Sequence, residues 1–213
     1  MKYPNFSEEK KFWKNGYKFV VGLDEAGRGP LAGPVVAGAV VFLNSKSKIL
    51  GVGVNDSKKI TSKKREKVYD YFKKNQNIAW GIGIISEKVI DRINILEATR
   101  LAMLKAVENL EKKLRKSPVQ VFLVVDGNIK LNINLPQKSI IKADQKVFSC
   151  ALASIFAKVT RDKIMQRYHK KYSKYGFDIH KGYGTSYHFK MLKKHGSCKI
   201  HRKSFELRVR DWF

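Results

Sequence analysis

Two valine-rich segments near the N-terminus constrain the fold most strongly. Residues 18–27 (KFVVGLDEAG) and 34–43 (PVVAGAVVFL) are apolar runs bounded by Gly and Pro, a pattern typical of β-strands. The connection between the two runs is too short to hold a crossover helix, so we expect the strands to pair antiparallel. A hairpin is therefore predicted to begin the fold.

The middle of the chain adds helices and strands in alternation. Apolar residues at helical spacing predict a helix at 62–75, before a third strand at 78–86, and a long helix from about Asn94 to Lys116. The continuous apolar run at 119–127 (VQVFLVVDG) is typical of a buried parallel strand, and the long helix before it suits a right-handed crossover. The sheet should therefore be mixed.

The last third of the chain is predicted to be mostly helical. A short strand at 139–144 precedes a long amphipathic helix from Gln145, and a further helix at 186–195 follows the loop KYGFDIHKGYGT. We expect an α/β fold with a mixed five-stranded sheet flanked by helices and a helical C-terminal part. A length of 213 residues suits one domain, 1–213, with a helical appendage from about residue 184.

The chain carries a large positive charge. It has 44 Lys and Arg against 18 Asp and Glu, a net charge of +26 at pH 7. Such an excess favours a polyanionic partner, above all nucleic acid, although a Lys-rich composition alone is the alternative. Basic side chains and all five histidines gather in residues 158–203, where a solvated helical face is the simpler interpretation. Lys158, Arg161 and Lys181 are the predicted phosphate contacts.

Membrane and secretion signals are missing from the sequence. No apolar run approaches the roughly 20 residues of a bilayer span, and the N-terminal segment lacks the apolar core of a signal peptide. Cys150 and Cys198 are too few for a disulfide framework, so we expect both to be reduced. We therefore expect a cytoplasmic protein with no membrane partner.

Four acidic residues lie at the ends of the predicted strands. Asp24 and Glu25 end the first strand, Asp126 ends VFLVV, and Asp144 ends SIIKA. Adjacent strands that end in acids gather them at one end of a sheet, where a cluster of carboxylates needs protons, basic groups or cations to neutralise it. Each acid alone reads equally well as an N-cap or turn residue, so the joint pattern carries the functional hypothesis.

The four acids predict a two-metal site. Carboxylate oxygens suit hard cations such as Mg²⁺, and two such ions roughly 4 Å apart can activate a water and stabilise a leaving oxygen in phosphodiester hydrolysis. Neighbouring strand residues point to opposite faces, so Asp24 and Glu25 converge only if the strand bends or bulges, which Gly22, Gly27 and Gly29 would permit.

Five motifs follow one another between residues 18 and 206. They are GLDEAGRGPLAGPVVAGAVV, VVDG, KADQK followed by ASIFAKVTRD, HKGYGT, and HRKSF. Together they closely resemble bacterial ribonuclease HII. The resemblance implies a ribonuclease H-like fold and Mg²⁺- or Mn²⁺-dependent cleavage of RNA in RNA/DNA hybrids. It also implies a nick 5′ of a single ribonucleotide in duplex DNA, leaving 3′-hydroxyl and 5′-phosphate ends, and hence roles in DNA repair and replication.

The resemblance also implies roles for individual residues. The family's metal-binding acids match Asp24, Glu25, Asp126 and Asp144, the same four that the strand ends indicate. Its glycine-arginine-glycine loop, which surrounds the ribonucleotide, matches Gly27, Arg28 and Gly29. Its tyrosine that senses the ribose at the RNA-to-DNA junction matches Tyr183, and its loop for strand-backbone contacts matches Asn55, Asp56, Ser57 and Lys58.

Without the resemblance, simpler interpretations of the same residues stay open. The glycine-arginine-glycine loop could be a plain turn, and a tyrosine between glycines is more often a packing residue. Glycines nevertheless let a backbone approach a sugar and phosphate closely, and an arginine can bind a phosphate bidentately. Type HIII relatives carry an additional N-terminal domain and a different glycine motif, so the short segment before the first strand favours type HII.

Other functions and partners also fit parts of the pattern. A non-catalytic basic RNA-binding protein explains the charge but not the acids, and a resolvase or integrase of the same fold explains the acids but not the glycine loop. His195, Cys198 and His201, with His188 nearby, have the spacing of a zinc site.

We expect the protein to be a monomer. The C-terminus either packs on the last helix, which we favour, or binds a sliding clamp through Glu206, Val209, Trp212 and Phe213.

Overall fold

The structure, a computed structural model, describes residues 4–44, 61–114 and 120–208. Its five-stranded sheet has the order β3-β2-β1-β4-β5. The strands are β1 (Phe19–Ala26), β2 (Val35–Phe42), β3 (Ile78–Ile85), β4 (Val121–Asp126) and β5 (Gln137–Ile140). β1, β2 and β3 pair antiparallel in succession, whereas β4 is parallel to both β1 and β5. The predicted hairpin and the mixed sheet are confirmed.

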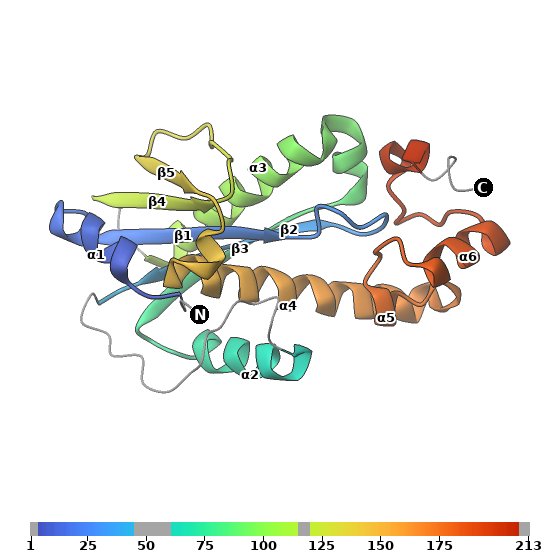
Figure 1. The fold of residues 1–213 in the computed structure, drawn as a ribbon, viewed down its shortest axis with the longest axis horizontal. Helices are drawn as coiled ribbons and strands as arrows, with labels where there is room; N and C mark the ends of the chain where they lie inside the picture. The colour runs from blue at the N-terminus through green and yellow to red at the C-terminus, as the bar shows by residue number, and fades with distance from the viewer. Residues whose placement is uncertain (1–3, 45–60, 115–119, 209–213) are drawn as a thin grey trace.

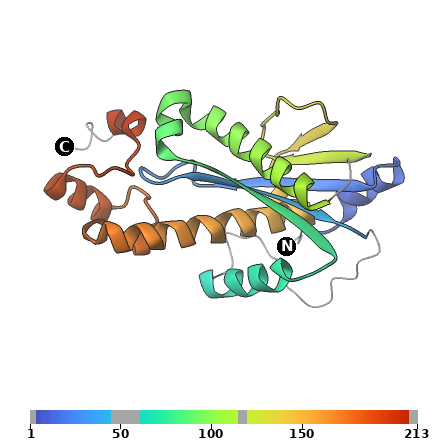
Figure 2. The same ribbon diagram turned by 180° about the vertical axis from the view of Figure 1, so that it is seen from behind.

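Helices cover both faces of the sheet. The α-helices are α1 (Ser7–Lys14), α2 (Ser62–Lys73), α3 (Glu87–Leu114), α4 (Phe148–Lys171), α5 (Phe177–His180) and α6 (Ser186–His195). Three 3₁₀ helices are η1 (Ala143–Gln145), η2 (Ser173–Tyr175) and η3 (Lys203–Arg208). α3 lies on one face and α4 on the other, with α2 outside α4, while α5, α6 and η3 form a helical C-terminal part beyond the β1–β2 connection (Figures 1 and 2). Within the described ranges, no helix is long and apolar enough to cross a membrane.

α4 packs directly against the backbone of the central hairpin. A Cβ atom at Gly22 would lie 2.3 Å from the Cys150 nitrogen, and one at Gly38 would lie 2.5 Å from the Ala153 carbonyl oxygen. Residues 148–157 are all buried, because the sheet covers one side of the helix and α2 the other. The prediction of an amphipathic helix is therefore wrong for these first three turns.

Two helices differ from the sequence-based prediction. α3 begins at Glu87, and Asn94, where the helix was predicted to start, is a kink with φ 65° and ψ 167°. The Asn94 side chain accepts hydrogen bonds from the Leu96 and Glu97 backbone N–H groups, so it caps the second, longer segment. α1 was not predicted; it packs on the sheet through Phe12, whose ring stacks on Phe122.

Candidate active site

The register of two parallel strands places Asp24 beside Asp126. Phe19 of β1 pairs with Val121 of β4, and the pairing continues to Leu23 and Val125. The next residue along each strand is an acid, and adjacent strands lie about 4.8 Å apart. The predicted meeting of these two carboxylates at one end of the sheet therefore follows directly from the hydrogen-bonded register.

Asp24 lies in surroundings that disfavour its charged form. Its side chain is buried, and burial raises its pKa well above the usual value, with further increases from the charges of Glu25 and Asp126. Hydrogen bonds with the Ser154 side chain and the Glu25 backbone N–H act in the opposite direction. A bound cation would stabilise the charged form of Asp24, because it would offset the repulsion from the neighbouring carboxylates.

Asp144 reaches the site from a turn instead of a strand. β5 ends at Ile140, and Lys142 adopts a left-handed conformation with φ 57°, which turns the chain into η1. The Ala143 N–H, within that short helix, donates a hydrogen bond to Asp126 Oδ1. The predicted strand at 139–144 is therefore shifted toward the C-terminus, since β5 is Gln137–Ile140. Asp144 is buried and directly follows Ala143, whose N–H bonds Asp126.

Glu25 contacts the loop that follows β1. The β1–β2 register runs one-to-one from Val21 to Ala26, so this described pair contains no bulge, one of the two ways in which Asp24 and Glu25 could converge, and successive side chains start on opposite faces. Glu25 Oε1 lies 3.4 Å from Arg28 Nη1. Through this ion pair, Glu25 contacts the glycine-arginine-glycine loop of residues 27–29.

The donor set of the four acids fits a hard divalent cation. All of its ligand atoms are carboxylate oxygens, and the like charges around Asp24 are those that Mg²⁺ or Mn²⁺ neutralises. Among the residues that the structure describes, no three His, Cys, Asp or Glu side chains already stand together as a ready-made metal site. The assignment of these four residues as metal ligands therefore stays a prediction.

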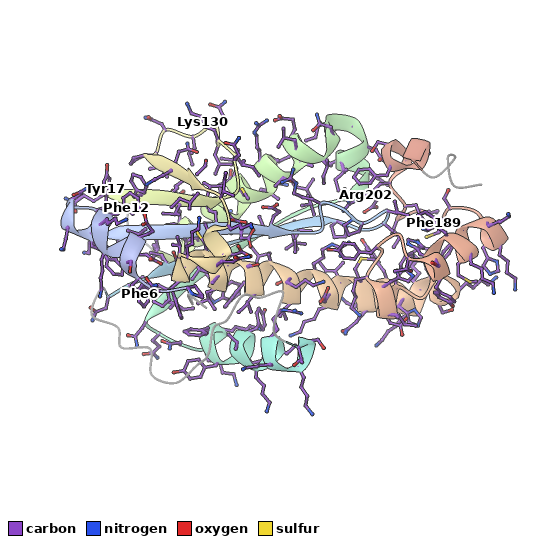
Figure 3. The ribbon with its side chains drawn as sticks, in the orientation of Figure 1. Phe6, Phe12, Tyr17, Lys130, Phe189 and Arg202 are labelled. Carbon is purple, nitrogen blue, oxygen red and sulfur yellow. The ribbon has the colours of Figure 1, made fainter. Side chains whose placement is uncertain are left out.

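A buried arginine from the HRKSF motif holds the glycine-arginine-glycine loop in place. Arg202 donates from Nη2 to the Gly27 carbonyl oxygen (2.6 Å), from Nη1 to that of Arg28 (3.0 Å) and from Nε to that of Gly33 (2.9 Å). Figure 3 shows Arg202 beside the β1–β2 connection, reached from the C-terminal segment. The loop is thus positioned by a residue 169 or more positions away.

Arg161 of α4 supports the same connection from its other end. It donates from Nε to the Pro34 carbonyl oxygen (3.0 Å) and from Nη2 to that of Ala32 (3.0 Å). Its third bond runs from Nη1 to the Lys181 carbonyl oxygen (2.9 Å). Gly27, with φ 100°, touches this side chain, because a Cβ there would lie 2.2 Å from Arg161 Nε. Arg161 is fully buried, so its predicted role as a phosphate contact is wrong.

Sequence reasoning missed both arginines as supports of the loop, although one signal was available. Arg161 lies four residues after Ala157 and four before Met165, both fully buried, which places it on the inner stripe of α4. Burial lowers the pKa of Arg161 to about 10, and burial together with the nearby Arg161 charge lowers that of Arg202 to about 9. Both guanidinium groups remain charged near neutral pH.

Tyr183 lies next to the glycine-arginine-glycine loop, as predicted. A Cβ at Gly29 would lie 3.9 Å from Tyr183 Cε1, and the Gly182 carbonyl oxygen accepts a hydrogen bond from the Leu31 N–H (2.8 Å). Tyr183 is 43% exposed, so it is not buried in the core. Asn55, Asp56, Ser57 and Lys58 lie outside the described residues.

The zinc hypothesis finds no support in the described part of the chain. Nε2 of His188 lies 3.0 Å from Nε2 of His201, so these two nitrogens face each other instead of a shared metal position. His201 Nδ1 accepts a hydrogen bond from the Cys198 backbone N–H. No group of His, Cys, Asp or Glu that could hold a metal is found there.

Fold and site together define a hydrolase of the ribonuclease H class: a mixed five-stranded sheet with acids at the ends of two parallel central strands. The family model of ribonuclease HII matches residues 21–208. A ribonuclease HII of Acetivibrio thermocellus is 52% identical over 92% of this chain and 73% of that protein. One of Chlamydia caviae is 48% identical over 92% of this chain and 88% of that protein. The chain belongs to the ribonuclease HII family.

Solved structures share the fold. The ribonuclease H2 of Pyrococcus horikoshii has a TM-score of 0.72 and 27% identity, covering 91% of this chain and 98% of its own. The ribonuclease HII in a PCNA complex from Archaeoglobus fulgidus has a TM-score of 0.69 and 23% identity, over 87% of this chain and 94% of its own. Bst-RNase HIII in complex with Mn²⁺ has a TM-score of 0.64 and 17% identity, over 87% of this chain and 65% of its own.

Proposed function

We propose that this protein is a metal-dependent endoribonuclease that cleaves RNA in RNA/DNA hybrids and nicks duplex DNA 5′ of a single embedded ribonucleotide. The products carry 3′-hydroxyl and 5′-phosphate ends, and the role is the removal of ribonucleotides during DNA repair and replication. One observation carries the proposal: buried Asp24 and its half-buried neighbour Asp126 lie at the same end of the sheet as the exposed Tyr183 and the glycine-arginine-glycine loop.

Asp24, Glu25, Asp126 and Asp144 are the residues that would hold Mg²⁺ or Mn²⁺. When bound, two such ions supply an activated water and stabilise the leaving oxygen of the phosphodiester. The Ser154 hydroxyl and the Glu25 N–H orient Asp24, while the Ala143 N–H orients Asp126. The Mn²⁺ held by Bst-RNase HIII supports this choice of ion.

Recognition of the ribonucleotide requires groups that meet its 2′-hydroxyl, the only group that distinguishes RNA from DNA at one nucleotide. We assign this task to the backbone of Gly27, Arg28 and Gly29 and to Tyr183. Arg202 and Arg161 bond the carbonyl groups around that loop, so the loop backbone is held before a substrate arrives. A site held this way loses no binding energy to loop ordering.

The partner is an RNA/DNA hybrid or a ribonucleotide-containing DNA duplex, bound by a monomer that works as one catalytic domain in the cytoplasm, where such duplexes arise. Lys158 lies 5.8 Å from the centre of the Tyr183 ring, which puts a basic group beside the proposed reading residue. The loop of Asn55, Ser57 and Lys58 would contact the strand backbone. A sliding clamp stays a further predicted partner, because Val209, Trp212 and Phe213 lie outside the described residues.

The decisive experiment compares four labelled duplexes: all-DNA, DNA with one ribonucleotide, DNA with four ribonucleotides, and a full RNA/DNA hybrid. Each is incubated with Mg²⁺, with Mn²⁺ and with a chelator, and the nick is mapped. We expect cleavage of every ribonucleotide-containing duplex only with metal, and an intact all-DNA duplex. Cleavage in the presence of the chelator would contradict the proposed metal dependence, and binding without cleavage under all three conditions would favour the alternative of a non-catalytic basic RNA-binding protein.

A further inference from the structure

Three buried imidazoles lie behind the exposed face of Tyr183. They are His180 at the end of α5, His188 in α6 and His201 in the segment after α6. The rings of His180 and His188 stack with centroids 4.3 Å apart, and those of His188 and His201 are 5.2 Å apart. The proposed function has no chemical task for these groups, because none is a predicted metal ligand or substrate contact.

The hydrogen bonds of His188 and His201 favour one arrangement of protons. The Cys198 N–H donates to His201 Nδ1 at 2.8 Å, whereas the Cys198 carbonyl oxygen lies farther from the same nitrogen, at 3.3 Å. The shorter contact assigns the proton of the neutral His201 ring to Nε2. That Nε2–H points at His188 Nε2 (3.0 Å), which must accept. His188 therefore carries its proton on Nδ1 and donates it to the Tyr183 carbonyl oxygen (2.9 Å). A directed chain thus runs from the Cys198 backbone to Tyr183.

His180 fixes the residue before Tyr183 in the same manner. The Gly182 N–H donates to His180 Nδ1 (3.1 Å), so Nε2 carries the proton and donates it to the Tyr175 carbonyl oxygen (2.6 Å). Gly182 has φ 86°, and its carbonyl oxygen accepts from the Leu31 N–H of the β1–β2 connection. Both backbone polar groups of Gly182, the residue before Tyr183, therefore have defined partners.

We propose that His188, oriented by His201, is a positioning residue for Tyr183 and sets where the tyrosine ring stands over the glycine-arginine-glycine loop. This proposal rests on the proposed function of Tyr183 as the reader of the ribonucleotide. The Tyr183 carbonyl oxygen also accepts a hydrogen bond from the Thr185 N–H at 2.9 Å. Two donors, the Thr185 N–H and His188 Nδ1–H, therefore fix the position of this carbonyl group. The bond from His188 is directional, because a reversed His188 tautomer would present a bare nitrogen to the carbonyl oxygen.

Protonation of either His188 or His201 breaks this chain of hydrogen bonds. An imidazolium at His201 sets Nδ1–H against the Cys198 N–H, and one at His188 sets two N–H groups against each other. Burial accordingly lowers the pKa of His188 and of His201 to about 4, so both rings are neutral at the pH of the proposed reaction. The titratable and charged groups around the three rings are Tyr168, Tyr175, Asp178, Lys181, Tyr187, His195, Cys198 and Arg202.

The direct test is the tautomeric state of each ring, read from imidazole ¹⁵N chemical shifts in the folded, metal-free protein at pH 7.5. We expect Nδ1–H at His188 and Nε2–H at both His180 and His201. An Nε2–H tautomer at His188 would overturn the proposal, whatever the activity of the enzyme, because no proton would then reach the Tyr183 carbonyl oxygen. An imidazolium at His188 would overturn it as well, because the ring would then have no acceptor for the His201 Nε2–H.

The functional test uses two variants of His188. His188→Asn places an amide N–H where Nδ1 stands and keeps a donor for Tyr183, whereas His188→Gln places its amide near Nε2 and loses that donor. On a duplex with one ribonucleotide, we expect His188→Gln to lower kcat at least tenfold and His188→Asn to stay within about threefold of the wild type. His195→Gln, on the exposed side of α6, is the matched control. Equal losses in Asn and Gln variants of equal melting temperature would overturn the proposal.

A double-variant cycle separates this proposal from that for Tyr183 itself. If His188 acts through Tyr183, His188→Gln should cause no further loss in a Tyr183→Ala background under single-turnover conditions. A full further loss there would show that His188 supports the fold alone, while the reading role of Tyr183 stands. A Tyr183→Ala variant as active as the wild type would refute the reading role and, with it, the positioning role.

Discussion

The replacement Arg202→Met tests whether the HRKSF arginine builds the candidate site from a distance. Arg202 is fully buried, and its three nitrogens donate to the carbonyl oxygens of Gly27, Arg28 and Gly33. Methionine has a similar length and can fill the space beside Phe205, although it loses the cation–π contact in which the guanidinium carbon lies 5.0 Å from the ring centroid. The replacement therefore removes the hydrogen bonds and the charge while it leaves most of the packing.

The expected cost follows from the three acceptors left behind. Each buried acceptor without a donor costs roughly 1–3 kcal/mol, which gives a gross loss of roughly 3–9 kcal/mol. Against this, the variant no longer buries a guanidinium charge, a term worth several kcal/mol. We expect a net loss near 3 kcal/mol in the free energy of unfolding, which for a chain of this size lowers the melting temperature by roughly 6–12 °C.

Two measurements on one preparation test this expectation. Urea unfolding reports the stability, and cleavage of the single-ribonucleotide duplex at 15 °C, where the variant stays folded, reports the loop. We expect kcat to fall at least tenfold in the folded variant, since the loop backbone is no longer held. Arg167→Met, on the exposed side of α4, is the matched control. A melting temperature within 2 °C of the wild type and unchanged cleavage would show that the loop holds itself.

Three further predictions concern the acids and the reading residue. Asp24→Asn should abolish metal-dependent cleavage yet raise the melting temperature of the metal-free protein, because Glu25 and Asp126 then no longer face a buried charge; a lower melting temperature would refute this. Burial raises the pKa of Glu9 to about 7, so stability is lost as pH rises from the ordinary value of 4.5 through 7. Glu9→Gln should then stabilise by about 3 kcal/mol in urea unfolding at pH 8 and by little at pH 4. Tyr183→Phe should keep part of the cleavage on a single-ribonucleotide duplex and Tyr183→Ala little, as measured by kcat/KM; equal values for Ala and wild type would leave Tyr183 as a packing residue.

The histidine chain predicts an acid-sensitive fold. Because the folded pKa of His188 and of His201 lies near 4, below the ordinary value of 6.5, the unfolded chain binds more protons between these values. Stability from the two neutral rings is complete above pH 6.5 and is lost as pH falls toward 4. Urea titrations of the wild type and His188→Asn should diverge less at pH 5 than at pH 7.5. Glu9, whose pKa shift has the opposite sign, masks part of this slope, so the comparison is best made in the Glu9→Gln background.

The sequence predicts the parts of the fold that depend on local apolar patterns. The hairpin and the parallel strand β4 follow from continuous valine-rich runs, and Asp24 and Asp126 are recognisable because each ends such a run. Asp144 was misplaced because Lys142 adopts a left-handed backbone that a non-glycine residue rarely takes, so no composition rule marks the end of β5. The hydrogen bond from the Ser149 N–H to the Glu9 carboxylate could not be predicted for another reason: the two residues are 140 positions apart in the sequence.

The buried arginines Arg161 and Arg202 bind backbone carbonyl groups and not the carboxylate of Asp24. Each of the three nitrogens of Arg161 and of Arg202 donates to a carbonyl oxygen of residues 27–34 or of Lys181. The charged neighbours of Asp24, Glu25 and Asp126, raise its pKa, whereas a paired arginine would lower it. Two cationic side chains therefore shape the loop without neutralising the acids. If the arginines paired with Asp24 instead, the site would lose its affinity for divalent cations, and Arg202→Met would tighten Mn²⁺ binding. We expect Mn²⁺ affinity, measured by titration calorimetry, to be unchanged or weaker in that variant, and a tighter affinity would contradict the separation of the two charge sets.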